Sequence, residues 1–127
     1  MVQQINALGE SLEPGGTGVV NVPASDADEL ILLPPYCNEA RLRRRFSDRP
    51  TSFVASLVNL TNNDKVCRLI WVRDGKIISV NSADFRVGMN LPGAQAWKLD
   101  ESREIRVTNE LQSANPFLSL NLVEVAP

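Results

Sequence analysis

Short runs in which apolar and polar residues alternate, separated by Pro, Gly and Asn, limit what this chain can fold into. Residues 104–108 show the pattern, because every second side chain is apolar, which is the period of a strand rather than a helix. About eight such runs recur roughly every ten residues, a spacing typical of antiparallel sandwiches and jelly rolls. We therefore predict an all-β fold, an antiparallel, jelly-roll-like β-sandwich over residues 18–127.

The strands are expected between turn-forming residues, and one hairpin is marked with particular clarity. Asp74-Gly75 joins two apolar runs, and a type I′ turn requires positive φ at both central residues, which Asp-Gly tolerates. Residues 66–73 carry apolar side chains at both alternating sets of positions, so both faces of this strand are expected to be at least partly covered. The expected strands are residues 19–22, 29–33, 51–60, 66–73, 76–80, 84–89, 104–108 and 117–125.

Two segments interrupt this rhythm. Residues 1–17 are rich in polar and turn-forming residues without an apolar period, which predicts an extended arm, either a disordered leader or a segment that orders on a partner. Residues 37–50 have too few apolar residues at helical spacing to bury a face. We expect an exposed Arg-rich loop there, in preference to a short helical turn over residues 39–45.

The formal net charge of −2 hides an uneven distribution of charge. Residues 1–40 hold six acids, among them Glu10 and Glu13, and no Lys or Arg, whereas residues 41–127 hold 13 bases and nine acids. Five of the ten arginines fall within nine residues: Arg41, Arg43, Arg44, Arg45 and Arg49. The near-neutral total argues against a nucleic-acid binder, which is usually strongly basic.

The arginine cluster has three interpretations. Guanidinium groups bind carboxylate or phosphate in a bidentate manner, so the cluster is an interface to an acidic protein surface, a nucleic-acid contact or a solvated loop. Only Tyr36 and Phe46 flank it, whereas proteins that bind single-stranded nucleic acid usually interleave aromatic residues for base stacking. A protein partner is therefore preferred. Trp97 is a candidate for stacking on a glycan, and Trp71, inside an apolar strand, is expected in the core.

Catalytic and metal-binding devices are scarce in this composition. The chain has no His, which removes the commonest general base and the commonest metal ligand, and it has no phosphate-binding glycine loop or zinc cluster. We therefore predict a protein that is not an enzyme, with no metal and no cofactor. Two groups of carboxylates are candidates for calcium binding and for glycoside hydrolysis, and solvated turns are preferred for both. They are Asp26, Asp28 and Glu29, and Asp100, Glu101 and Glu104.

The two cysteines, Cys37 and Cys67, bear on the cellular compartment. No signal peptide or stretch approaching the ~20 apolar residues of a membrane span is visible, so synthesis in a cytosol is expected. There the two thiols are expected to stay reduced rather than to pair in a disulfide.

The order of these pieces resembles the small β-sandwich virion proteins of tailed bacteriophages. A turn-rich arm leads into residues 18–24, an apolar strand, a strand ending at residues 57–62, a hairpin, residues 99–107 and a closing strand ending at residues 123–125. The resemblance covers residues 17–126 and rests on strands and turns. It departs from the commonest pattern at residues 37–50, where the Arg-rich segment stands.

This resemblance to capsid decoration, or cement, proteins implies a structural virion protein that binds the outer capsid surface and stabilises the shell. Its partners would be the major capsid protein and sister copies, often as a homotrimer, with no nucleic acid and no membrane. It would be made in the host cytoplasm and reside on the virion. The five arginines and the acidic Glu10 and Glu13 are the expected interface. The alternative is a phage tail or host-facing carbohydrate-binding module that uses Trp97.

Overall fold

The computed structural model describes residues 1–23, 25–61, 66–86, 89, 93–99, 102–112 and 115–123. Within them lie seven strands in two sheets and three short helices. Every strand pair in the two sheets is antiparallel. The all-β prediction is therefore right for the strands and wrong in omitting the helices. The chain divides into two compact units, residues 1–25 with 84–90 and 100–127, and residues 26–83 with 91–99.

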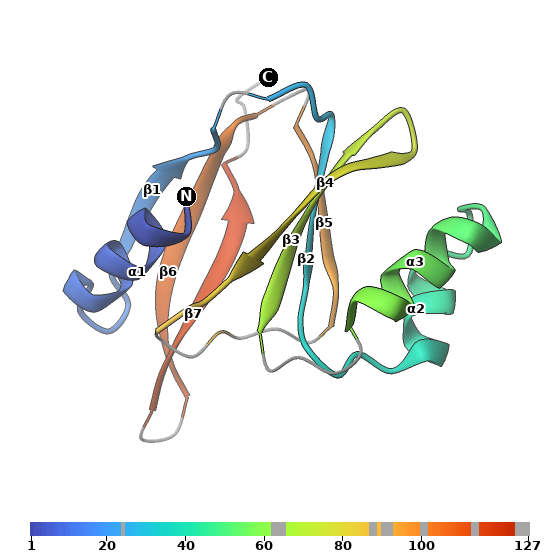
Figure 1. Cartoon of the computed structure of the whole chain (residues 1–127). Helices are drawn as coiled ribbons and strands as arrows, with labels where there is room; N and C mark the ends of the chain where they lie inside the picture. Colours follow the sequence, from blue (N-terminus) through green and yellow to red (C-terminus); the bar gives the residue numbers. More distant parts are fainter. Residues whose placement is uncertain are drawn as a thin grey trace. The chain divides into compact units, whose positions relative to one another are not determined.

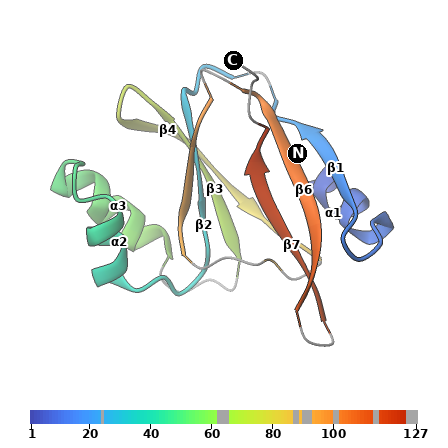
Figure 2. The same ribbon diagram turned by 180° about the vertical axis from the view of Figure 1, so that it is seen from behind.

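The first unit is a three-stranded sheet with one helix, α1 (Val2–Ser11). Its strands follow the order β1-β6-β7 and span Thr17–Asn21, Glu104–Gln112 and Asn115–Leu122. Figures 1 and 2 show α1 alongside β1 and β6. The buried apolar side chains of these strands are Val20, Ile105, Val107, Leu118 and Leu120. The strands predicted at residues 19–22, 104–108 and 117–125 are confirmed over the residues that the structure describes.

Residues 2–11 form a helix, so the predicted extended arm at residues 1–17 is wrong. Ile5 is fully buried, and the Asn6 side chain is held from both ends: its Nδ2 donates to Asp84 O and its Oδ1 accepts from Arg86 N, each at 2.9 Å. A Cβ on Gly9 would lie 2.5 Å from a terminal carbon of the buried Leu118 side chain. Glycine is a poor helix former, but here it allows the helix to approach β7 closely. These long-range contacts leave no local pattern in the sequence.

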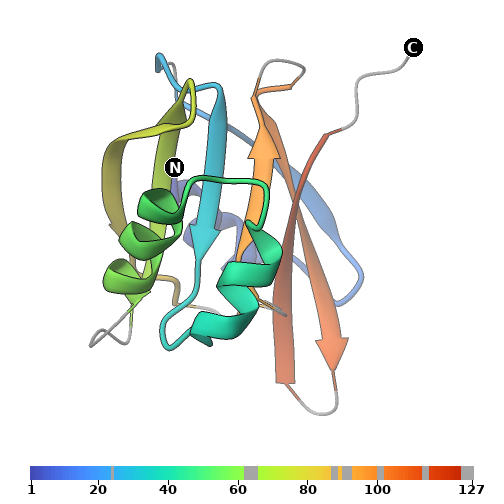
Figure 3. The same cartoon turned by 90° about the vertical axis from the view of Figure 1, so that its right-hand side faces the viewer.

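The second unit is a four-stranded sheet with two helices on one face. Its strands follow the order β4-β3-β2-β5 and span Lys76–Ala83, Cys67–Arg73, Glu29–Leu33 and Gln95–Lys98. Figure 3 shows α2 (Glu39–Arg45) and α3 (Thr51–Thr61) lying across this sheet. A cluster of buried side chains joins sheet and helices: Ile31, Leu33, Ile70 and Val72 from the strands, with Leu42, Phe46, Phe53, Val54 and Leu57 from the helical segment.

Helices replace two expected features of this unit. The predicted strand at residues 51–60 is wrong because its buried residues, Phe53, Val54, Leu57 and Thr61, recur at helical spacings of three and four. The predicted Arg-rich loop at residues 37–50 is wrong over residues 39–45, which form α2. Asn38 caps this helix, its Oδ1 accepting from Arg41 N at 3.2 Å, and arginines in the last turn complement the helix dipole.

The hairpin prediction is confirmed. Asp74 and Gly75 have φ of 50° and 76°, as a type I′ turn requires, and they connect β3 to β4. Residues 69–72 of β3 are all buried, so both faces of this strand are covered as predicted. Residues 84–86 are not a strand, and β5, which pairs with β2, had not been expected. The turn expected at residues 61–65 is wrong at Thr61, which is the last residue of α3, and residues 62–65 lie outside the described residues. The pair Asp100-Glu101 and the end of the closing strand at 124–125 also lie outside them.

Replacing Ile5 by Ala tests whether α1 belongs to the folded core. The substitution is expected to lower the free energy of unfolding by about 2–4 kcal/mol, because it leaves a cavity where the buried side chain packed. Urea unfolding followed by circular dichroism measures the change. Gln3→Ala, at an exposed position of the same helix, is the control and is expected to change stability by less than about 0.5 kcal/mol. Equal stability of the two variants would show that α1 is dispensable.

Candidate binding site on helix α2

Helix α2 presents most of the arginine cluster to solvent. Leu42 is the helix residue that is buried, and the four arginines around it are exposed. Arg43 Nη2 contacts Glu39 Oε1 at 2.8 Å, one turn earlier on the same helix. Among the residues that the structure describes, no carboxylate forms an ion pair with Arg41, Arg44 or Arg45. We call these three residues the α2 arginines.

Arg49 has a different environment. Its Nη1 and Nη2 donate to the two carboxylate oxygens of Glu29 at 2.8 and 2.5 Å, and the two side chains are 22% and 12% exposed. The guanidinium also lies 5.5 and 5.1 Å from the ring centroids of Phe46 and Phe53. The hydrogen bonds to Glu29 raise the pKa of Arg49 above its ordinary value. Arg49 therefore fastens the α2–α3 connection to β2 rather than extending toward a partner.

The acidic residues of the predicted interface are placed separately. Glu10 belongs to α1 in the first unit, and its Oε1 lies 3.0 Å from Arg86 Nε. Glu13 is exposed in the segment that follows α1. In the second unit, Asp28 Oδ2 accepts from Asp74 N at 3.1 Å. Much of the acidity of residues 1–40 thus serves contacts within the fold.

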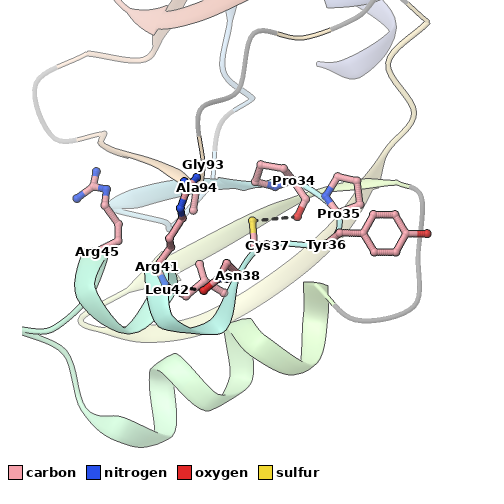
Figure 4. A pocket seen from close by; sticks show the side chains of 10 residues that line it. All are labelled: Pro34, Pro35, Tyr36, Cys37, Asn38, Arg41, Leu42, Arg45, Gly93 and Ala94. Carbon is pink, nitrogen blue, oxygen red and sulfur yellow. Dashed lines mark hydrogen bonds between the residues drawn. The ribbon is translucent and has the colours of Figure 1, made fainter.

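A cleft of about 480 Å³ opens beside α2. Arg41 and Arg45, one helical turn apart, lie on its wall, and Figure 4 shows their side chains rising from α2 on the same side. Tyr36 lies at the cleft with 65% of its surface exposed, and its side chain points away from the two arginines. The cleft is lined by Pro34, Pro35, Tyr36, Cys37, Asn38, Arg41, Leu42, Arg45, Gly93 and Ala94.

The buried hydroxyl of Thr61 holds one wall of this cleft. It donates to Pro34 O and accepts from Cys37 N, both at 2.9 Å, while Thr61 O accepts from Tyr36 N at 3.3 Å. These bonds tie the end of α3 to the segment before α2, where Tyr36 has a left-handed φ of 57°. Such a φ is uncommon for a residue other than glycine and needs support from its surroundings. No local pattern in the sequence indicates this arrangement.

The two cysteines are free, half-buried thiols. Cys37 lies in the cleft wall, where its Sγ donates to Pro34 O at 3.3 Å. Burial raises the pKa of the Cys37 thiol, and the hydrogen bond with Thr61 opposes this rise in part. Burial also raises the pKa of Cys67, with a further rise from the nearby Cys37. Neither thiol is therefore an activated thiolate near neutral pH.

The two tryptophans differ in burial. Trp71 is in the core, as predicted, and its Nε1 donates to Asn81 Oδ1 at 2.7 Å. Trp97, the candidate for glycan stacking, is half-buried on β5 opposite Leu30.

The candidate carboxylate sites receive little support. Among the residues described, no three acids or cysteines converge as a metal site would require, and Glu29 is already paired with Arg49. Glu104 begins β6, whereas its suggested partners Asp100 and Glu101 fall in a gap of the described chain. No helix in the described part of the chain has the length and apolar character needed to cross a membrane.

Comparisons with protein-family models, with curated proteins and with solved structures found no match for this chain. The interpretation of the α2 site therefore rests on its own geometry and charge.

Substituting Arg49 by Ala tests its structural role. The change leaves the Glu29 carboxylate without its partner, so we expect the free energy of unfolding to fall by about 2–3 kcal/mol. This is less than the loss for a fully buried ion pair, because both side chains are partly exposed. Arg44→Ala, at an exposed arginine of the same cluster, is the matched control, with an expected change below about 0.5 kcal/mol. Chemical denaturation of both variants measures the difference. Similar stabilities would show that the ion pair contributes little.

The raised thiol pKa values predict slow alkylation of the folded protein. In the unfolded chain the thiols ionise with a pKa of about 8.5, whereas in the folded chain they stay protonated to higher pH. Reaction with iodoacetamide, followed by mass spectrometry, should therefore begin at higher pH for the native protein than in urea. Burial makes the thiolate less favourable in the folded state than in the unfolded state. The free energy of unfolding is therefore highest below about pH 8.5, where both states hold the thiol proton, and falls as pH rises further. Identical pH profiles in both states would contradict this.

Proposed function

We propose that this protein is a non-enzymatic binding subunit. It binds an acidic surface of another protein through the α2 arginines and the cleft beside them. The observation that carries the proposal is the exposure of Arg41, Arg44 and Arg45 on one short helix, with no carboxylate partner among the described residues. Guanidinium groups remain protonated at physiological pH, so they suit the recognition of anions better than proton transfer.

The mutual repulsion of these charges opposes the isolated helix, although the helix dipole favours Arg44 and Arg45 in the last turn. Arg41 lies three residues before Arg44 and four before Arg45, and like charges at these spacings destabilise a helix by about 0.2–0.5 kcal/mol per pair. Carboxylates of a partner would turn this mutual repulsion into attraction, with the planar guanidinium groups accommodating bidentate contacts.

A protein partner is preferred to nucleic acid for two reasons. The chain as a whole has a formal charge of −2, whereas nucleic-acid-binding proteins are usually strongly basic. The exposed aromatic residue of the site, Tyr36, points away from Arg41 and Arg45, so it does not offer a stacking platform beside them. An extended acidic protein segment that lies between Arg41 and Arg45 therefore suits the cleft better than a nucleic-acid strand does.

The particular role that we propose is decoration of a virion shell, in which many copies bind the major capsid protein on the outer capsid surface. The resemblance to bacteriophage cement proteins supports this role through the remaining strands and the hairpin of its pattern, whereas α1 and α3 replace its arm and the strand predicted at residues 51–60. Repetition on a shell multiplies modest contacts by avidity, so a small charged site of this kind is sufficient. In this proposal the protein is made in the host cytoplasm and assembles with sister copies on the capsid.

A charge-matched pair of double variants tests the docking site. Arg41→Ala/Arg45→Ala removes the two cleft arginines, and Lys98→Ala/Arg106→Ala removes two exposed cations elsewhere. With a fluorescein-labelled peptide of ten glutamates as probe, anisotropy is expected to show at least about tenfold weaker binding for the first variant only, equivalent to about 1.4 kcal/mol. Binding by the wild type should weaken with added salt. Equal losses in both variants would mean that binding reflects total charge rather than this site.

Antibody labelling of purified phage particles tests the virion role. Labelling spread over the heads is the expected result. Labelling confined to tails would replace the shell role by the host-facing alternative, in which a glycan array should show binding that depends on Trp97. Absence of the protein from purified particles would overturn the virion role altogether, while leaving the test of the α2 site unaffected.

A further inference from the structure

The outer edge of β4 differs from the other sheet edges of the described chain. In the second unit, the opposite edge strand β5 has only four residues. In the first unit, β1 has five residues, and β7 is met by Met89 through a parallel bridge at Leu118. β4 has eight residues and, in the part of the chain that is described, pairs only with β3. Figure 3 shows it at the margin of its sheet.

Most of β4 is open to solvent on both faces. Residues 78–82 are all exposed, and because successive side chains of a strand point to opposite faces, neither face is covered there. Ile78 and Val80 are 48% and 37% exposed, which places them among the few large hydrophobic residues that the described surface leaves open. A strand in this position gains little from the core and offers a row of unpaired peptide groups.

The usual protections of an edge strand are present only at the beginning of β4. Lys76 is its first residue, and a bulge at Ile78 interrupts the register, since Val72 pairs with Ile77 and Trp71 pairs with Ser79. From Ser79 to Ala83 the strand contains no charge, no proline and no further irregularity. Charged residues, prolines and bulges are the devices by which soluble proteins prevent edges from pairing. The second half of β4 lacks all three.

We propose that two copies of this chain pair β4 to β4, antiparallel, and join their four-stranded sheets into one continuous sheet of eight strands. A two-fold axis relates two identical strands in an antiparallel pair, so the free N–H and C=O groups of each copy bond to those of the other. The axis brings the uncharged second halves of the two strands together and keeps the two Lys76 side chains at opposite ends. A second copy is therefore a better occupant of this edge than a charged partner, which would find no complementary charge at its centre.

This pairing is independent of the proposed docking function, because β4 and the α2 arginines use different residues. It favours assemblies of even number rather than the trimer that the family resemblance implies. Each dimer would carry two α2 sites, which raises the avidity for any repeating surface.

Self-association of the full chain tests the inference. Light scattering coupled to size exclusion, from about 1 µM to about 1 mM protein, is expected to show the mass rising from 14.0 kDa toward twice that value. Val80→Lys places two like charges close to the axis and is expected to weaken the dimer by at least about tenfold. Val19→Lys is the matched control, because Val19 is a valine that is 51% exposed on an edge strand of the other sheet. It is expected to leave the dimer unchanged.

Two results would overturn the proposal: a wild type that stays monomeric over the whole range, or a dimer that both lysine variants weaken equally. Hydrogen exchange on the wild type gives a second measurement that does not depend on how well Val80→Lys folds. Backbone amides of residues 79–83 are expected to exchange more slowly at high than at low protein concentration. Unchanged exchange in β4, or slowing confined to another edge, would place the contact elsewhere.

Discussion

The packing of α2 and α3 onto one face of the four-stranded sheet is the contact on which the candidate site depends. Ile31, Ile70 and Val72 of the sheet meet Leu42 and Phe53 of the helices, and each fully buried side chain of this size contributes about 1.5–3 kcal/mol. Helix α2 has seven residues and buries only Leu42, so it is too short to be stable alone. Its position is therefore set by this core, by the Asn38 cap and by the hydrogen bonds around Thr61.

The fold divides one run of arginines into groups with different roles. Arg49 turns inward and is neutralised by Glu29, and Arg43 is paired with Glu39 along its own helix. The α2 arginines remain exposed and without carboxylate partners in the described residues. A loop would have averaged these charges over many conformations. A helix fixed to the sheet instead holds Arg41 and Arg45 on the same side of one cleft, which is the preorganisation that selective binding requires.

The open edge of β4 and the α2 site belong to the same compact unit and complement each other. From Ile78 to Ser82 the edge offers backbone hydrogen bonds, uncharged polar side chains and two exposed aliphatic ones, a surface suited to an identical strand. The α2 site offers positive charge, a surface suited to a different and acidic protein. We propose that one surface joins copies of the chain and the other binds an acidic partner, and the two together would reinforce a repetitive assembly.

Features that depend only on neighbouring residues could be predicted from the sequence alone. The positive φ values of Asp74-Gly75, the short apolar runs of β1 and β2 and the alternation in β6 and β7 are local, so these elements were predicted correctly. The helices could not be predicted in this way, because they depend on contacts that form only in the tertiary structure. Helix α1 is stabilised because Ile5 is buried and Gly9 lies against Leu118 of the three-stranded sheet. Helix α3 is stabilised because Phe53 and Leu57 pack on one face of the four-stranded sheet. The fold also determines which arginine is internal, because the positive charge of Arg49 is compensated by Glu29, which lies 20 residues away along the chain and is in contact only in the fold.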